Sequence, residues 1–209
     1  MRGYGQYCGL ARSLEIVGDR WNLLIVRQLL LGPARYRDLT DGLPGIATNL
    51  LADRLRDLEA AGVLERRLAG KGSAVEYALT PWGAELREPI ESLIRWSTPL
   101  MVRGPEGDAF RPEWLALALP ALLGARVKIR AAATVGFEVG GPPFQLRASR
   151  SGVEIGPRDG RELDATVRAD PACVLGLAAG ALALDDAKAL GMIEIDGAES
   201  VVRAVFAAR

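Results

Sequence analysis

The sequence predicts two domains, the first mainly α-helical and the second α+β with an antiparallel sheet and packed helices. Three observations support this. The 209 residues exceed the usual length of one domain. Apolar residues repeat with helical spacing through most of the first hundred positions, and they alternate as in strands through much of the remainder. Between the two patterns, residues 103–112 are rich in Gly, Pro and charge, so we expect a linker there between domains at 1–102 and 113–209.

Composition removes several classes of function. The chain has no histidine, so His-dependent catalytic triads, histidine-containing zinc sites and the commonest general base are ruled out. No G-x-G-x-x-G or P-loop string appears in the sequence. We therefore expect no catalytic residue, no metal site and no cofactor. The formal net charge is +0, so bulk charge gives no sign of a nucleic-acid partner.

Nothing in the sequence predicts secretion or a membrane span. The N-terminal residues lack the uninterrupted apolar stretch of a signal peptide, and the apolar runs at 114–123 and 172–184 contain Pro or Gly and are too short to cross a bilayer. The two cysteines, Cys8 and Cys173, do not make a disulfide framework and fit a reducing compartment. We expect a cytoplasmic protein with no membrane partner.

In the first domain the pattern predicts helices followed by a hairpin. Helical spacing covers 8–18 and 19–31, with Gly32-Pro33 as a stop, then a short stretch ending at Gly42 and a longer one from about Thr48 to Ala61. Residues 62–80 carry two short strand patterns around the flexible tip 69–74. Thr80 is a candidate N-cap and Pro81 a helix start, and this helix is expected to run amphipathically to about Met101.

In the second domain strands and helices alternate. A helix is expected over 113–124 with Pro120 as a possible kink, and alternating strand patterns fill 126–141, 144–156 and 163–170. A helical region of small residues follows over 171–191, then a last strand over 192–197 and a terminal helix. This order predicts helices packed against one sheet.

The helix from Thr48 has two distinct faces. Leu51, Leu55 and Leu58 fall within about 60° of one another on a helical wheel and predict a buried stripe. Asn49 and Arg56 lie roughly opposite. A short helix and a tight break precede this helix and a hairpin follows it, which is the order of a winged helix-turn-helix. In that fold the N-terminal residues of the second helix meet base edges and basic residues meet phosphates.

Several ordered strings in the first half resemble the HxlR-type winged-helix transcriptional regulators. The likeness runs from about Tyr7 to Trp96, and its strongest pieces are "GDRW", "LLLGPARYRDL", "LADRLRDLEAAGVLERR" and "VEYALTPWG". The resemblance implies a homodimer, held by the first helix and the long helix after the wing, that binds a pseudo-palindromic operator in double-stranded DNA. It also implies regulation of transcription without catalysis.

The resemblance assigns candidate DNA-binding residues to three places. Recognition-helix positions able to face bases are Thr48, Asn49 and Asp53, with Arg54 and Arg56 on the same helix. The others are Arg37 on the preceding helix and Arg66, Arg67 and Lys71 at the wing. Each arginine could instead belong to an ordinary solvated face. Arg54 could pair with Asp57 or another acid, and Asp53 could repel phosphate and serve only as an intramolecular partner.

The two cysteines carry different expectations. Some members of the family sense oxidants or electrophiles through an N-terminal cysteine, and Cys8 matches that position. The alternative for Cys8 is a small apolar residue at the start of the first helix or in the dimer interface. A sensor thiol needs thiolate character and exposure. Cys173, within an alanine-rich helix, is expected to be core.

The second half is similar to sterol-carrier-protein-like domains. The likeness rests on the segment 169–206, with its small-residue turn, its "G-x-I-x-I-x-G"-like strand and its closing helix. It implies a tunnel for an acyl chain or another hydrophobic small molecule. Candidate lining residues are Trp114, Leu117, Phe137, Phe144, Leu175 and Leu182. Each could equally be plain core, and the domain could serve only to stabilise a dimer.

Three functional hypotheses remain open from the sequence. The favoured one is a homodimeric transcriptional regulator whose C-terminal domain binds an apolar effector, with ligand and DNA affinities coupled. The second is the same DNA-binding protein switched through Cys8. The third is a lipid-binding or carrier protein whose N-terminal half mainly dimerises.

Overall fold

A computed structural model of the chain describes residues 3–69, 74–104, 106–124, 132–150 and 152–206. The chain forms two compact units, Met1–Ile90 and Glu91–Arg209. Along the chain they meet inside one helix, α6 (Arg87–Ser97). The linker expected at 103–112 and the domain bounds on either side of it stay a prediction.

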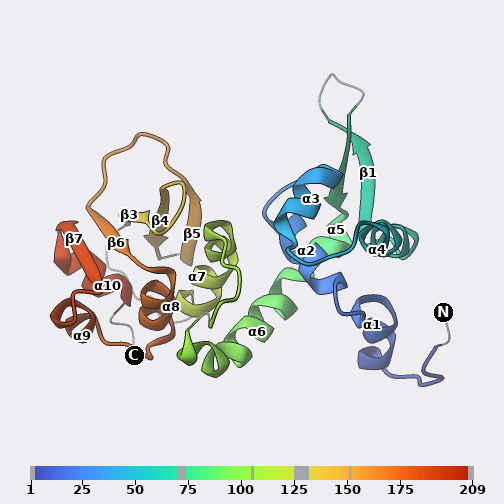
Figure 1. The fold of residues 1–209 in the computed structure, drawn as a ribbon, viewed down its shortest axis with the longest axis horizontal. Coiled ribbons are helices and arrows are strands. Elements are labelled where there is room, and N and C mark those ends of the chain that lie inside the picture. Colours follow the sequence, from blue (N-terminus) through green and yellow to red (C-terminus); the bar gives the residue numbers. More distant parts are fainter. Residues whose placement is uncertain (1–2, 70–73, 105, 125–131, 151, 207–209) are drawn as a thin grey trace. The chain divides into compact units, whose positions relative to one another are not determined.

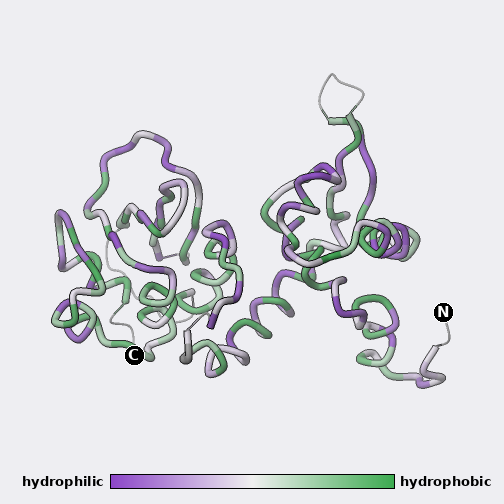
Figure 2. Tube along the Cα trace, in the orientation of Figure 1, coloured by the Kyte–Doolittle hydropathy of each residue, from purple (hydrophilic) through white to green (hydrophobic). Residues whose placement is uncertain are grey.

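The first unit begins with four helices that match the expected ones closely (Figure 1): α1 (Gly9–Val17), α2 (Asn22–Leu30), α3 (Tyr36–Gly42) and α4 (Thr48–Ala60). The apolar faces of α2, α3 and α4 form the core, because long aliphatic side chains from these three helices are buried there. These side chains are Ile25, Val26, Leu29, Leu39, Leu51, Leu55 and Leu58. The predicted leucine stripe of α4 is therefore confirmed, and Figure 2, which views α4 nearly end-on, shows both hydrophobic and hydrophilic residues on this helix.

A two-stranded antiparallel hairpin follows α4. It consists of β1 (Leu64–Leu68) and β2 (Val75–Leu79), with pairs running from Leu64 opposite Leu79 to Leu68 opposite Val75. Tyr77 of β2 also exchanges backbone hydrogen bonds with Ala34, which joins the hairpin to the turn between α2 and α3. The hairpin thus has the place of a wing beside the helix-turn-helix.

The corner after the wing is fixed by Thr80. Its hydroxyl oxygen accepts the N–H of Gly83 at 3.0 Å, which confirms the expected N-cap of α5 (Pro81–Ala84). The same hydroxyl donates to the carbonyl of Gly62 at 2.7 Å. This one side chain therefore ties the start of α5 to the end of α4.

The single helix expected from Pro81 to about Met101 is wrong in detail. The chain forms α5, then α6 (Arg87–Ser97), then a 3-10 helix η1 (Thr98–Arg103). The prolines explain the breaks. Pro89 has no N–H to donate to Glu85 and is tolerated only in the first turn of a helix, so a new helix begins just before it. Pro99 likewise ends the regular α-helix at Ser97.

The second unit is built on a five-stranded mixed sheet. Its strands are β3 (Ala133–Glu138), β4 (Phe144–Ser149), β5 (Gly152–Pro157), β6 (Ala165–Ala169) and β7 (Ile193–Gly197), in the order β5-β4-β3-β6-β7. The prediction of an antiparallel sheet is only partly right, because β3 and β6 pair in parallel while the other neighbours are antiparallel. The part of the first strand pattern at 126–131 lies outside the described residues.

The connection between β5 and β6 causes the parallel pair. After β5, at the edge of the sheet, residues 158–164 carry the chain past β4 and β3 so that β6 can begin beside β3 (Figure 1). A Cβ on Gly136 would lie 2.4 Å from the terminal methyl of Leu163, so glycine at this position leaves room for the Leu163 side chain of the connection. Short turns predict antiparallel neighbours, whereas a crossover produces a parallel one.

Helices cover the sheet and complete one core. They are α7 (Leu115–Leu123), α8 (Pro171–Ala179), α9 (Leu184–Ala189) and α10 (Glu199–Phe206), with the 3-10 helix η2 (Pro112–Trp114) before α7. The region predicted as helical over 171–191 is two helices, since Gly180 has φ of 72°, a left-handed conformation suited to glycine that ends α8. Phe137 and Phe144 stack in the core with ring centroids 5.2 Å apart.

Candidate functional sites

The first turn of α4 presents Thr48 and Asn49 on an exposed surface. Ala47 precedes the helix in an extended conformation, and the hydroxyl of Tyr36 on α3 donates to the carbonyl of Thr48 at 2.5 Å. The side-chain oxygen of Asn49 accepts the N–H of Leu50 at 2.9 Å. The leucine stripe seats the opposite face of α4 in the core, so these two polar residues face outward from a fixed helix.

Two arginines of α4 have different surroundings. The side chain of Arg54 is 22% exposed and pairs with Asp19, before α2, and with Asp57 at 3.2 Å. This is the intramolecular pairing that the sequence left open for Arg54. Arg56 is exposed and pairs with Asp53 one turn earlier. Asp53 thus has an intramolecular partner, and Arg56 stands on the open side of the helix.

The wing and α3 carry the remaining candidate arginines. On β1, Arg66 pairs with Glu59 at 2.9 Å and Arg67 with Glu76 at 2.8 Å. Arg37 on α3 is 92% exposed and lies 3.9 Å from Asp41. Exposed pairs of this kind contribute little to stability, so each arginine can exchange its partner for a phosphate at small cost. Lys71 lies outside the described residues.

Cys8 and Cys173 differ as the sequence suggests. Cys8 is exposed and stands before the first turn of α1. The backbone N–H groups of Ala11 and then Leu10 favour its thiolate and hold the pKa of Cys8 below its ordinary value. Cys173 is buried in the core of the second unit, where burial, and next the charge of Asp170, raise its pKa. Thiolate character and exposure therefore coincide at Cys8.

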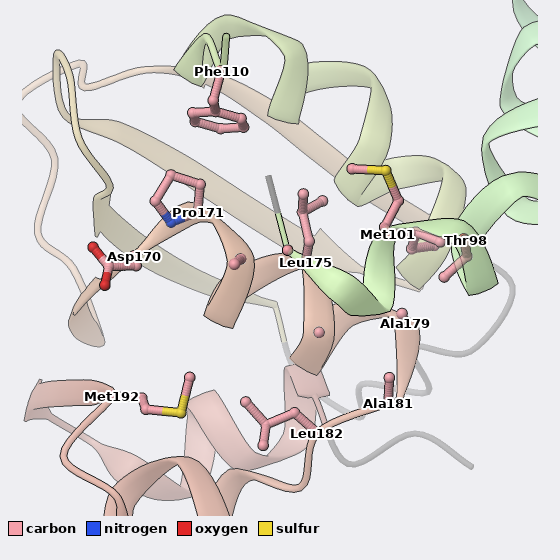
Figure 3. Close-up of a pocket in the computed structure, with 14 residues that line it drawn as sticks. Thr98, Met101, Phe110, Asp170, Pro171, Leu175, Ala179, Ala181, Leu182 and Met192 are labelled. Atoms are coloured by element: carbon pink, nitrogen blue, oxygen red, sulfur yellow. The ribbon is translucent and has the colours of Figure 1, made fainter. Parts of the chain in front are cut away.

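The second unit contains an apolar cavity of about 560 Å³ between η1, α7, α8 and the segments on either side of α9 (Figure 3). Two of the six predicted lining residues, Leu175 and Leu182, line it. Leu117, Phe137 and Phe144 are buried in the core instead, and Trp114 packs edge-on against Phe110, with ring centroids 6.4 Å apart. The cavity is also lined by residues that sequence reasoning did not select: Met101, Phe110, Leu122, Pro171 and Met192.

These additional residues had no common signal in the sequence. Phe110 lies in the segment expected to be a linker, and Met101 and Met192 are 91 positions apart. Only the fold brings them together. The cavity wall combines the segment after α6 with α8 and with the residues just before and just after α9. A lining of this kind follows from topology rather than from any local pattern.

Neither a candidate membrane span nor a candidate metal-binding cluster occurs in the described part of the chain. None of its helices is long and apolar enough to cross a membrane. Within the same ranges no group of three or more cysteine or carboxylate side chains is arranged to hold a metal ion.

The fold and the exposed first turn of α4 define the class of protein: a winged helix-turn-helix, in which a second helix and a wing meet DNA. The model of the HxlR-like helix-turn-helix family matches residues 16–104. The transcriptional regulator YodB of Bacillus subtilis is 33% identical over 86 residues, which are 41% of this chain and 77% of YodB. The chain therefore belongs to the HxlR-like helix-turn-helix family of transcriptional regulators.

A second regulator and a solved structure are also similar to part of the chain. An uncharacterized HTH-type transcriptional regulator of Mycobacterium tuberculosis, Rv3095, is 37% identical over 103 residues, or 49% of this chain and 64% of the relative. Among solved structures, quinone-bound YodB from Bacillus subtilis is 30% identical and covers 43% of this chain and 96% of its own, with a TM-score of 0.39. The family model ends at residue 104, and the sterol-carrier-like character of the second half stays a prediction.

Proposed function

We propose that the protein is a homodimeric repressor or activator of transcription that binds double-stranded operator DNA through α4 and the wing, and whose second unit binds an apolar small-molecule effector. Because its target is DNA, we place it in the cytoplasm. Family membership supports the DNA-binding part of the proposal. We propose in addition that the chain forms a dimer, that it binds an effector, and that particular residues contact DNA.

The observation that carries the DNA-binding proposal is the exposed polar start of α4 above a fully buried leucine stripe. A helix seated in this way keeps its N-terminal turn in a defined position, as base recognition requires. Thr48 and Asn49 are then the base-reading residues, and Asn can bond adenine in the major groove. Arg37 on α3, Arg56 on α4, and Arg66 and Arg67 on β1 would neutralise phosphates.

Exposed apolar side chains support the dimer. Tyr7, Leu10 and Leu14 at the start of the chain are exposed, and so is Trp96 of α6, at 76%. Large apolar side chains left in solvent can mark association surfaces. Leu10 and Leu14 lie on α1 and Trp96 lies on α6, the helices that the family resemblance assigns to the dimer interface, and Tyr7 precedes α1.

DNase footprinting tests the proposal with the purified chain and the DNA upstream of its own gene. We expect protection of two half-sites with a spacing of about one helical turn, as a two-fold symmetric dimer requires. Analytical ultracentrifugation of the free chain should give a dimer. Uniform weak protection of random and upstream DNA alike would contradict the proposal.

The chemistry of Cys8 favours a second candidate, a regulator switched by thiol oxidation. Its exposure and lowered pKa are the properties that make a cysteine reactive. Replacing Cys8 with Ser should then abolish the loss of operator binding caused by oxidant, measured by gel shift. If the Cys8→Ser variant responds to oxidant as the parent chain does, the redox switch is wrong.

A further inference from the structure

The cavity of the second unit has the size and lining of a small-molecule site. Its volume of about 560 Å³ lies within the range of roughly 300–1,000 Å³ typical of ligand pockets. Met101 and Met192 stand on different sides of it with Leu175 between them (Figure 3). The two methionines are 56% and 41% exposed, so apolar surface at the rim stays in solvent. Methionine adapts its shape to different apolar partners, which suits a binding surface.

The charge carried by the described residues that line this cavity is negative. Of the described residues that line it, Asp170 is the one charged side chain, and it is exposed at the start of α8. The other polar side chain, Thr98, donates its hydroxyl proton to the carbonyl of Ile94 at 2.9 Å. A ligand carboxylate can only accept hydrogen bonds, so it would meet another acceptor and a hydroxyl whose proton is already used.

The N-terminus of α8 does not reverse this preference. Helix N-termini attract anions, but Asp170 is the N-cap residue of α8, and although its side chain makes no cap hydrogen bond it places a negative charge at this terminus already. Cys173 in the first turn reports the local field, because burial and then the charge of Asp170 oppose formation of its thiolate. An anionic head group at the cavity would meet the same opposition.

We propose that this cavity binds an uncharged apolar molecule and selects against carboxylate-headed acyl chains of the same length. This inference rests on the proposed function, since it names the site and the chemical class of the effector. Thr98 and Met101 belong to η1, which continues directly from α6, the helix in which the two units join along the chain. A bound molecule would therefore contact η1, and through η1 and α6 its binding could alter the DNA-binding unit.

Methionine-methyl NMR on the full chain tests the site. The chain has three methionines, Met1, Met101 and Met192, and two of them line the cavity. Titration with decanol should shift the signals of Met101 and Met192 and leave that of Met1 in place. Decanoate at pH 7.5 should bind at least fivefold more weakly than decanol.

Three variants make the test specific. Ala172 is exposed and lines the cavity, so Ala172→Phe should fill it and remove the response to decanol without disturbing the core. Ala204 on α10 is exposed and is not among the lining residues, so Ala204→Phe is the matched control and should respond like the parent. Asp170→Asn keeps the shape of the side chain and removes its charge. In this variant decanol should bind less than twofold more tightly than decanoate.

Each outcome decides the inference. Unmoved Met101 and Met192 signals, or an unchanged decanol response in Ala172→Phe, would show that this cavity is not the site. Equal affinities for decanol and decanoate would overturn the selection against carboxylates. DNA binding is measured separately: operator binding without a decanol response removes this inference alone. A decanol response in a chain that does not bind its upstream DNA removes the proposed function alone.

Discussion

Cys8 and Cys173 are the same chemical group in opposite surroundings. The thiol of Cys8 is exposed beside the first N–H groups of α1, whereas Cys173 is packed in the core near Asp170. Because the thiolate is the nucleophile, the pKa and the exposure act in the same direction at each site. The two cysteines therefore form an internal comparison.

We predict that iodoacetamide modifies Cys8 and spares Cys173 in the folded chain. The pKa of Cys8 is lowered, so its alkylation rate should reach half of its maximum at a pH below that of an ordinary thiol. Peptide mass spectrometry across a pH series measures the alkylation rate of each cysteine and the pH at which the rate of Cys8 is half of its maximum. Equal rates at the two cysteines in the folded chain would contradict the assignment, and denaturant should remove the difference.

Gly83 is a second residue whose identity is fixed by its surroundings. A Cβ at this position would lie 1.9 Å from the carbonyl oxygen of Val63, and that oxygen is backbone and cannot move aside freely. We predict that Gly83→Ala lowers the free energy of unfolding by about 1–3 kcal/mol, as overpacking does.

Gly9 provides the control for Gly83. It stands at the start of α1 with open space where a Cβ would be, so Gly9→Ala should leave stability unchanged or slightly raised. Urea denaturation of both variants is the measurement. A Gly83→Ala chain as stable as Gly9→Ala would show that α5 does not pack on Val63 as described.

At the scale of elements, α4 carries one arginine that is mostly covered and one that is exposed. Arg54 is mostly covered and joins α4 to Asp19, which lies 35 positions earlier, while Arg56 is exposed with a partner on its own helix. We predict that Arg54→Ala costs about 1 kcal/mol of stability. Arg56→Ala should cost less than about 0.5 kcal/mol and should instead weaken DNA binding.

Thermal unfolding and DNA titration of the two arginine variants distinguish these roles. If Arg56→Ala destabilised the chain as much as Arg54→Ala and bound DNA normally, the division of α4 into two faces would be wrong. The DNA affinity of Arg56→Ala, but not that of Arg54→Ala, should also depend less steeply on salt concentration, because one fewer counterion would be released.

Local patterns predicted most elements of the first unit. The leucine stripe located α4, Gly32-Pro33 ended α2, and Thr80 capped the helix after the wing. The same reasoning missed the breaks on either side of α6, where Pro89 and Pro99 outweigh the amphipathic pattern. It named Asp57 as a possible partner of Arg54 but not Asp19, since the sequence shows no sign that α4 lies beside Asp19.

The second unit was harder to predict because its defining features are non-local. Alternation revealed the strands, but the parallel β3–β6 pair depends on where the connection 158–164 crosses the sheet. The cavity depends on the same topology. All four of Leu175, Leu182, Phe137 and Phe144 were expected to line it. Leu175 and Leu182 do, whereas Phe137 and Phe144 pack in the core.

At the scale of the whole molecule, the proposals link ligand and DNA binding. If η1 carries occupancy of the cavity to α6, saturating decanol should change the affinity for operator DNA severalfold, and DNA should change the decanol affinity by the same factor. Ala172→Phe should lose this coupling and Ala204→Phe should keep it. Fluorescence anisotropy with labelled DNA measures it, and an identical decanol effect in both variants would contradict the link.

Fluorescence anisotropy with two duplexes shows whether the exposed first turn of α4 reads DNA sequence. One duplex carries the upstream region of the gene and the other its shuffled sequence, over a series of salt concentrations. We expect salt-dependent binding with a clear preference for the upstream duplex. Asn49→Ala should lose about tenfold or more of that preference and keep its binding to the shuffled duplex. If the parent chain bound both duplexes equally, or if Asn49→Ala kept the full preference, the first turn of α4 would not read DNA sequence.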